Sequence, residues 1–157
     1  MEARRQPLSM SNHGLDSDHY RKLEHLYASA PVTQWYGAAI TVGDGQAEVR
    51  FTIRPEFHHA AHAVHGSVYF RALDDAAFFA ANSRVSDVFV LTVSFTVHFA
   101  RPVTSGELRA VGRIIHGGGR LFFAESTLFN DAGEMLGHGS GVFTRSSIAL
   151  TPAVGYA

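Results

Sequence analysis

The stretch HGSVYFRALDDAAFFAA, residues 65–81, predicts a helix over residues 68–81 that is apolar on every side. A helix with this pattern needs other elements to cover it all round. Two adjacent acids, Asp74 and Asp75, interrupt the apolar sequence. Carboxylates are rarely buried without a specific partner, so we expect at least one of the two to take part in chemistry.

Strand patterns surround this helix. Before it, residues 35–42 and 47–53 flank the turn Gly43-Asp44-Gly45 and predict a hairpin with one buried face. After it, apolar and polar residues alternate strictly over residues 91–99. Turn residues then separate three further predicted strands, at residues 107–116, 121–129 and 134–145. Because strands and helices do not alternate, we expect an α+β fold in which a curled antiparallel sheet wraps around one long central helix.

The two ends of the chain have weaker patterns. A short amphipathic helix is predicted from Asp16 or Ser17, both good N-cap residues, until Pro31 ends it. The sequence before this helix is polar and has no clear period, and the last residues contain both Pro and Gly. We therefore expect a flexible N-terminal arm at residues 1–14, a single domain at residues 15–147 and an irregular C-terminal tail at residues 148–157.

The composition excludes several classes of function. The 157 residues, 46% of them hydrophobic, suffice for one domain with its own core. The absence of cysteine excludes disulfides, thiolate zinc sites and cysteine nucleophiles. A formal net charge of -1 provides no basic field for nucleic acid, and no apolar run approaches the roughly 18 residues of a membrane span. We expect a soluble, cytoplasmic protein with neither nucleic acid nor a membrane as partner.

The residues around the two acids point to hydrolysis of an acyl group. On a helix, Asp74 and Asp75 point about 100° apart, and Arg71 lies within pairing reach of both. If Asp75 pairs with Arg71, Asp74 is left for a pocket; the alternative is that both acids form ordinary ion pairs. Gly66 lies where the helix begins, so its N–H is a candidate donor to a developing oxyanion. A carboxylate further along the helix can serve as base or nucleophile.

The motif His65-Gly66-Ser67, with Ala80-Ala81-Asn82-Ser83 beyond it, resembles that of the hotdog-fold acyl-CoA thioesterases of the phenylacetate-degradation (PaaI) type. Their signature is His-Gly-Gly with an Asp or Glu nine positions after the histidine, where this chain has Asp74. The resemblance covers about residues 34–146, strands and turns included. It implies the hotdog fold and hydrolysis of an acyl-CoA to the free acid and coenzyme A, with no metal or redox cofactor.

The resemblance also implies roles for individual residues. Asp74 corresponds to the general base or nucleophile, the Gly66 N–H to the group that polarises the thioester carbonyl, and Thr92 to a hydroxyl residue that helps to position water. Ser67 replaces the usual second glycine and lies where it can contact the substrate. Its side chain is small enough for a tight helix start.

Four histidines precede the helix, His58, His59, His62 and His65. Their spacing is compatible with three imidazoles around a metal ion, but no cysteine is present to complete a ligand set. We expect instead that they line or order an active-site loop, with His59 and His65 among the catalytic residues and no metal bound. His59 stands where relatives carry Asn or Gln; it can donate the same hydrogen bond but can also titrate near neutral pH.

Further residues are candidates for substrate contacts. Phe70 and Phe78 lie one helical turn from Asp74 on either side and are candidates for an acyl pocket. Basic residues beside the Gly117-Gly118-Gly119 turn can meet the phosphates of coenzyme A, although each is equally explained as a solvated residue at a strand end. These residues are Arg113, His116 and Arg120.

The resemblance implies a homodimer or a homotetramer built from two dimers, with the active site at the dimer interface. Alternative functions are a non-catalytic acyl-CoA-binding or regulatory protein that uses the same pocket, an acyl-thioester dehydratase, and a metal-binding module organised by the histidines. Binding of acyl-CoA without turnover separates the first alternative from an enzyme. Metal content separates the last.

Overall fold

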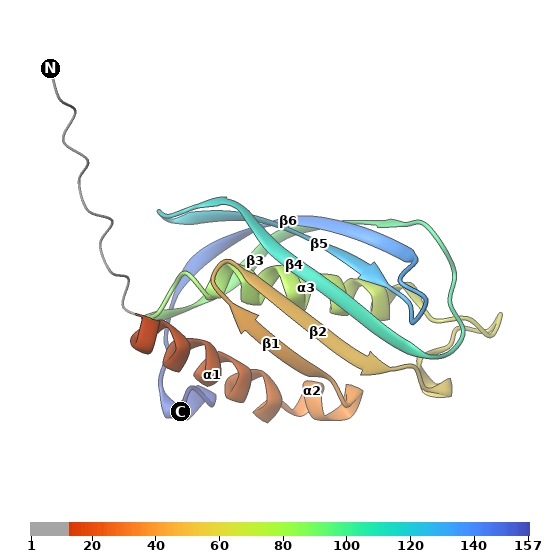
Figure 1. Cartoon of the computed structure of the whole chain (residues 1–157), viewed down its shortest axis with the longest axis horizontal. Coiled ribbons are helices and arrows are strands. Elements are labelled where there is room, and N and C mark those ends of the chain that lie inside the picture. The colour runs from red at the N-terminus through yellow and green to blue at the C-terminus, as the bar shows by residue number, and fades with distance from the viewer. Residues whose placement is uncertain (1–12) are drawn as a thin grey trace, which may run out of the picture.

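The computed structural model describes residues 13–157, in which a six-stranded antiparallel sheet curls around one helix, α3 (Gly66–Asn82) (Figure 1). The strands are β1 (Ala39–Gly43), β2 (Gln46–Thr52), β3 (Val88–Phe99), β4 (Glu107–Gly117), β5 (Leu121–Phe129) and β6 (Met135–Ala149). They lie in the order β1-β2-β4-β5-β6-β3, and every neighbouring pair is antiparallel. This is the α+β architecture expected from the sequence.

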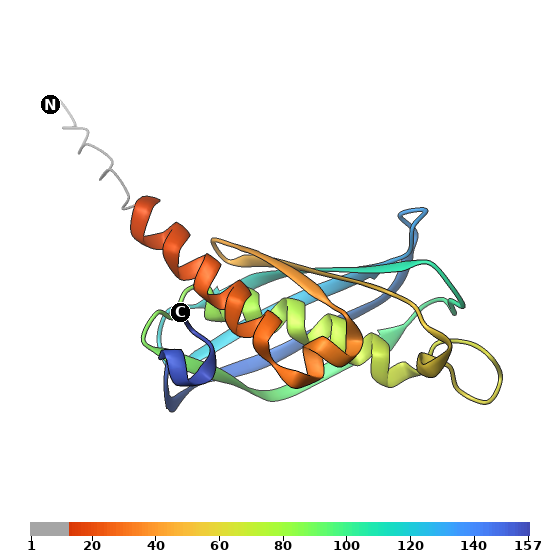
Figure 2. The ribbon, with the colours of Figure 1, turned by 90° about the horizontal axis from the view of Figure 1, so that it is seen from below.

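Helix α3 is covered on both sides, as its apolar sequence requires. The sheet covers one side, while α1 (His13–Ser29) and the short α2 (Pro31–Tyr36) cross the other (Figure 2). Small residues let the sheet approach closely, since a Cβ at Gly112 of β4 would collide with the carbonyl oxygen of Ala76. The Ser126 hydroxyl of β5 also donates a 2.6 Å hydrogen bond to the Leu73 carbonyl. The core therefore lies between α3 and the concave face of the sheet.

The region after α1 differs from the prediction. The strand expected from residue 35 begins only at Ala39, because residues 31–36 form α2. Pro31 does not merely end α1; it occupies the first turn of the next helix, where its missing N–H is not needed. Gly37 then ends α2 in the left-handed conformation, with a φ of 67°, and its N–H bonds to the Thr33 carbonyl at 2.9 Å.

The other predicted elements are present with small shifts at their ends. Helix α1 begins at His13, and residues 1–12 of the predicted arm lie outside the described residues. Strand β6 continues to Ala149, two residues into the predicted tail, which then forms the 3-10 helix Pro152–Val154. The tail lies against α1, where Tyr156 and His19 form a 2.7 Å hydrogen bond. Among residues 13–157, no helix is long and apolar enough to cross a membrane.

Strand β3 forms one edge of the sheet and pairs only with β6 among the described strands. It is 12 residues long and largely exposed: Leu91, Val93 and Phe99 are 44%, 60% and 60% exposed, and the polar residues Thr92, Ser94, Thr96 and His98 are exposed as well. A long, exposed edge of this kind is a surface on which another strand can pair.

Candidate active site

The two adjacent acids of α3 contact different neighbours. Asp75 faces α1, where the Tyr27 hydroxyl donates a 2.9 Å hydrogen bond to its Oδ2. The Arg71 guanidinium lies 3.2 Å from the same oxygen, which confirms the i,i+4 pair expected from the sequence. Asp74 faces β3, where the Thr92 hydroxyl donates to its Oδ1 at 3.1 Å. No ion pair within residues 13–157 involves Asp74, so its carboxylate is not already neutralised by a cation in direct contact.

Asp75 belongs to a polar network that joins three helices. Arg71 donates a further hydrogen bond of 3.0 Å to the Thr33 hydroxyl and lies 4.5 Å from the centroid of the Tyr36 ring. Burial raises the pKa of Asp75 to about 6, against the opposing effects of Arg71 and Tyr27. The network holds α1 and α2 on α3, which is a structural use for the second acid.

Asp74 has an environment suited to proton transfer. Burial raises the pKa of its carboxyl group, and the Thr92 hydrogen bond and the charge of Arg71 partly oppose this increase. The side chain is half-buried, so one oxygen can be held by Thr92 while the other remains within reach of a ligand. A raised pKa makes an ionised carboxylate a stronger base toward water.

A β-bulge directs Thr92 toward Asp74. The pairing of β3 with β6 shifts register directly after Thr92, which leaves Val93 as the extra residue. Before the bulge Val90 and Thr92 face α3, whereas after it Phe95 packs against the core. The unbroken alternation predicted over residues 91–99 is therefore wrong at Val93, because an extra residue reverses the two faces of a strand.

His65 caps the start of α3. Its Nδ1 accepts a hydrogen bond from the Ser67 N–H at 3.0 Å and lies 2.7 Å from the Ser67 hydroxyl. The serine that departs from the family motif thus adds a second contact to the cap. Gly66 is the first residue of the helix, and no group within residues 13–157 accepts a hydrogen bond from its N–H. That N–H is available to a polarised carbonyl oxygen.

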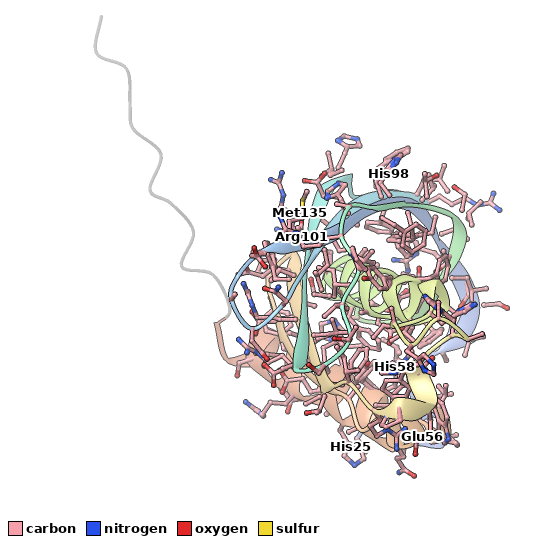
Figure 3. The ribbon with its side chains drawn as sticks, turned by 90° about the vertical axis from the view of Figure 1, so that its right-hand side faces the viewer. His25, Glu56, His58, His98, Arg101 and Met135 are labelled. Atoms are coloured by element: carbon pink, nitrogen blue, oxygen red, sulfur yellow. The ribbon has the colours of Figure 1, made fainter. Side chains whose placement is uncertain are left out.

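A cavity of about 390 Å³ opens beside Gly66, at the end of the molecule that faces the viewer in Figure 3. The Phe99 ring lies over Gly66, and a Cβ at this position would be 3.1 Å from the ring. His59 and Arg101 also line the cavity. The His59 Nδ1 accepts a hydrogen bond from the Ala61 N–H at 3.1 Å, which leaves its Nε2 as a donor toward a ligand.

Gly66 and Asp74 do not meet in one chain. They are eight residues apart on one helix, which corresponds to a rise of about 12 Å. Asp74 does not line the cavity beside Gly66. A carbonyl oxygen bound to the Gly66 N–H therefore lies too far from the Asp74 carboxylate of the same chain for a single bridging water to connect them.

The histidines before α3 shape a loop. Within residues 13–157, no three His, Asp, Glu or Cys side chains are grouped so that they could hold a metal ion. The His59 and His65 rings are 6.5 Å apart between centroids. His58, labelled in Figure 3, bonds through its Nε2 to the Thr104 carbonyl at 2.8 Å. His62 adopts a φ of 62°, a left-handed conformation that lets the loop turn back toward α3.

The basic residues proposed for coenzyme A lie away from Gly66 of the same chain. Arg113 and His116 are in the half of β4 that leads to the β4–β5 turn, where Arg120 also lies, whereas the loop before α3 adjoins the opposite end of β4 (Figure 1). Arg113 forms an ion pair with Glu125, and the His116 ring lies 6.4 Å from that of Phe123. Their contact with coenzyme A stays a prediction.

The two phenylalanines predicted for an acyl pocket flank Asp74. Phe78, one turn later on α3, is buried, and its ring lies 5.0 Å from that of Phe89 between centroids. Phe70, one turn earlier, is 41% exposed and packs edge-on against Phe95. The sequence carried no signal for Phe99 above Gly66 or for Tyr27 beside Asp75, because each lies more than 30 residues from its partner.

Comparisons with known proteins agree with this fold. Residues 61–136 match a family model described as the thioesterase superfamily. No curated protein matches the chain in sequence. Among solved structures, the Escherichia coli PaaI protein from the phenylacetic acid degradation operon is 20% identical, with a TM-score of 0.79 over 88% of this chain and 100% of that chain.

Two further structures show the same likeness. A conserved protein from Pseudomonas aeruginosa is 25% identical, with a TM-score of 0.71 over 74% of this chain and 94% of the other. A thioesterase from Haemophilus influenzae is 16% identical, with a TM-score of 0.72 over 80% and 88% of the two chains. Residues 61–136 thus resemble the thioesterase superfamily in sequence, and the described chain has the hotdog fold of these solved structures.

Proposed function

We propose that this chain is an acyl-CoA thioesterase in which Asp74 activates the attacking group and the Gly66 N–H stabilises the oxyanion. The environment of Asp74 carries the proposal: its pKa is raised by burial, Thr92 holds one oxygen, and the neighbouring acid is already engaged by Arg71 and Tyr27. A thioester hydrolase is also the activity for which the superfamily is named.

The proposed site needs two copies of the chain. Because Gly66 and Asp74 are about 12 Å apart along one helix, two antiparallel α3 helices are required to bring the Gly66 of one copy to the Asp74 of the other. The exposed edge strand β3 offers a surface on which two copies can pair. We place the enzyme in the cytoplasm as a homodimer or as a tetramer of two dimers, which the absence of cysteine fits.

In the proposed reaction, the thioester carbonyl oxygen accepts a hydrogen bond from the Gly66 N–H of one copy. The ionised Asp74 of the other copy takes a proton from water, and the water oxygen bonds to the carbonyl carbon. The tetrahedral intermediate then collapses, the carbon–sulfur bond breaks, and Asp74 returns the proton to the leaving thiolate. Direct attack by the Asp74 carboxylate is the covalent variant: the thiolate leaves, a mixed anhydride forms, and water then cleaves it. One turnover in ¹⁸O-labelled water labels Asp74 when the water attacks the Asp74 carbonyl of this anhydride.

The main test measures thiol release from acetyl-, hexanoyl-, dodecanoyl- and phenylacetyl-CoA. We expect Asp74→Asn to lower kcat by about 10²-fold or more, as loss of a general base does. Asp75→Asn is the matched control on the same helix and should keep kcat within about fivefold, because Asp75 contacts only structural partners. Circular dichroism checks that both variants fold. Full activity in Asp74→Asn, or binding of acyl-CoA by the wild type without turnover, contradicts the proposal.

A second test examines the two-copy site. Gly66→Pro removes the N–H but keeps a residue suited to the first helical position, whereas the control Gly66→Ala adds a side chain and retains the N–H. We expect Gly66→Pro to be inactive and Gly66→Ala to retain more activity. Mixing Gly66→Pro with Asp74→Asn chains under refolding should restore about a quarter of wild-type activity, because half of the dimers contain one intact site. A mixture that stays inactive contradicts a shared site.

A further inference from the structure

A second cavity, of about 450 Å³, lies between α1 and the end of the sheet where β3 begins and β6 ends. Leu26 and Pro31 form one wall, Phe89 and Ile148 the second, and residues 153–155 of the C-terminal tail the third. No charged side chain lines it, and its single hydroxyl, on Ser29, is already bonded to the Leu26 carbonyl at 3.0 Å. The cavity is therefore suited to an apolar ligand and offers no partner for a charged one.

Two packed aromatic rings lie between this cavity and Asp74. Phe78 follows Asp74 by one turn on the same face of α3, a rise of about 6 Å. Its ring lies 5.0 Å from that of Phe89, which lines the cavity. The Asp74–Thr92 hydrogen bond and the Phe78–Phe89 contact thus form two successive links between α3 and β3. The cavity therefore lies beyond Phe89, further from Asp74 in the direction of the C-terminal end of α3.

The third wall is the C-terminal tail itself, which hydrogen bonds to α1 hold in place. Its Gly155 carbonyl accepts a hydrogen bond from His25 at 2.8 Å, and the Tyr156 hydroxyl bonds to His19. Gly155 has a φ of 87°, and a Cβ at this position would collide with the Ser29 hydroxyl. The tail is therefore packed closely against α1, and it determines the width of the cavity at this end.

We propose that this cavity receives the apolar end of the acyl group, so that the chain acts on medium- and long-chain acyl thioesters and its C-terminal tail determines the chain-length preference. This inference rests on the proposed thioesterase function. To reach the space lined by Leu26 and residue 153, the end of an acyl group attacked beside Asp74 has to separate the packed rings of Phe78 and Phe89. Acetyl groups are too short to reach that space. Each methylene that enters the cavity should raise kcat/KM about three- to fourfold.

The first test fills the cavity from two of its walls. Ala30→Phe and Ala153→Phe place a ring in the lining, and Ala132→Phe, on the exposed β5–β6 turn, is the matched control. We expect both cavity variants to lower kcat/KM for dodecanoyl-CoA by about tenfold or more and to leave acetyl-CoA within about twofold, because only the longer chain buries methylenes there. The control should keep the wild-type profile. An unchanged chain-length profile in both cavity variants overturns the inference.

The second test works without turnover and with a minimal substitution. Because the chain has no cysteine, Ala153→Cys introduces a single thiol in the cavity, and Ala132→Cys provides the control thiol. In an Asp74→Asn background, saturating dodecanoyl-CoA should slow alkylation at position 153 by N-ethylmaleimide about tenfold or more, while acetyl-CoA should not, because only the long chain reaches this position. Neither ligand should protect position 132.

The outcomes separate the two proposals. Equal alkylation at position 153 with and without dodecanoyl-CoA overturns the cavity assignment, even if the wild type hydrolyses acyl-CoA. A thiol at position 153 that resists alkylation in the ligand-free protein also overturns it, because another part of the assembly then fills the cavity. Protection by dodecanoyl-CoA in a protein whose wild type shows no turnover supports the cavity and contradicts the proposed enzyme.

Discussion

Asp74 and Asp75 are neighbours on α3, yet the two faces of the helix that carry them have different constructions. The Asp75 face is closed by α1 and α2 and contains a cation and a phenol that both contact Asp75 Oδ2, and a hydroxyl that accepts a hydrogen bond from the cation. The Asp74 face is bordered by the edge strand β3 and supplies one hydroxyl. A buried acid that is engaged by a cation and a phenol holds helices together, whereas an acid that is held by one hydroxyl and has no cation in direct contact is suited to chemistry.

The largest expected effect comes from removing the cation on the Asp75 face. Arg71→Gln leaves Asp75 partly buried without its ion-pair partner and should lower the free energy of unfolding by about 3–5 kcal/mol at pH 8. The loss should be smaller at pH 5, where Asp75 is protonated. Urea unfolding at both pH values measures it. In the double variant with Asp75→Asn the losses should not add, and strictly additive losses would show that the two side chains do not interact.

The pH dependence of stability should report on the Asp75 face. The pKa of Asp75 is about 6 in the fold against an ordinary value of 3.8, so the fold favours the protonated form. Its stabilising contribution is complete below pH 3.8 and is lost as the pH rises through about 6. The difference corresponds to about 3 kcal/mol. The unfolding free energy of the wild type should therefore fall relative to that of Asp75→Asn between pH 4 and pH 8; a constant difference contradicts the assignment.

The phenol on the Asp75 face should have a smaller effect. Tyr27→Phe removes one hydrogen bond to a carboxylate and should lower the free energy of unfolding by about 1.5–2 kcal/mol at pH 8. Tyr36→Phe is the matched control, because the ring of Tyr36 remains over Arg71 and the change should be below about 0.5 kcal/mol. Thiol release should be unaltered in both variants. A loss of activity in Tyr27→Phe without a loss of stability would show that the Asp75 face also takes part in the reaction.

The smallest effect is expected on the Asp74 face, and it should appear in activity. Thr92→Val removes the hydrogen bond to Asp74 and should lower kcat/KM about three- to tenfold, with stability nearly unchanged. Because Thr92 lowers the pKa of Asp74, its loss should also move the acidic limb of the pH–rate profile to higher pH. Thr92→Ser keeps the hydroxyl and serves as the control. An acidic limb that stays in place would show that Asp74 does not govern the profile.

Patterns of short range predicted most of the fold. The apolar sequence of residues 68–81 predicted α3, and alternation with turn residues predicted β4, β5 and β6 to within a few residues. The Arg71–Asp75 pair was predictable because i and i+4 are neighbours on any helix. The first helix ends before Pro31 as predicted, but the second helix that Pro31 begins was missed, because a proline that ends one helix can begin the next. The bulge at Val93 was missed, because the alternation of residue types continues through it unbroken.

The sequence by itself determined the central helix, the strands around it, the separation of the two acids by about 100° and the position of Gly66 at a helix start, because each depends on residues within a few positions of one another. Only the tertiary structure decided that Asp74 meets Thr92, that Asp75 meets Tyr27, and that an apolar cavity extends from Phe89 to the C-terminal tail. These contacts join segments that are distant in the chain. The register of β3 and the packing of α1 bring them together, and no local pattern encodes either.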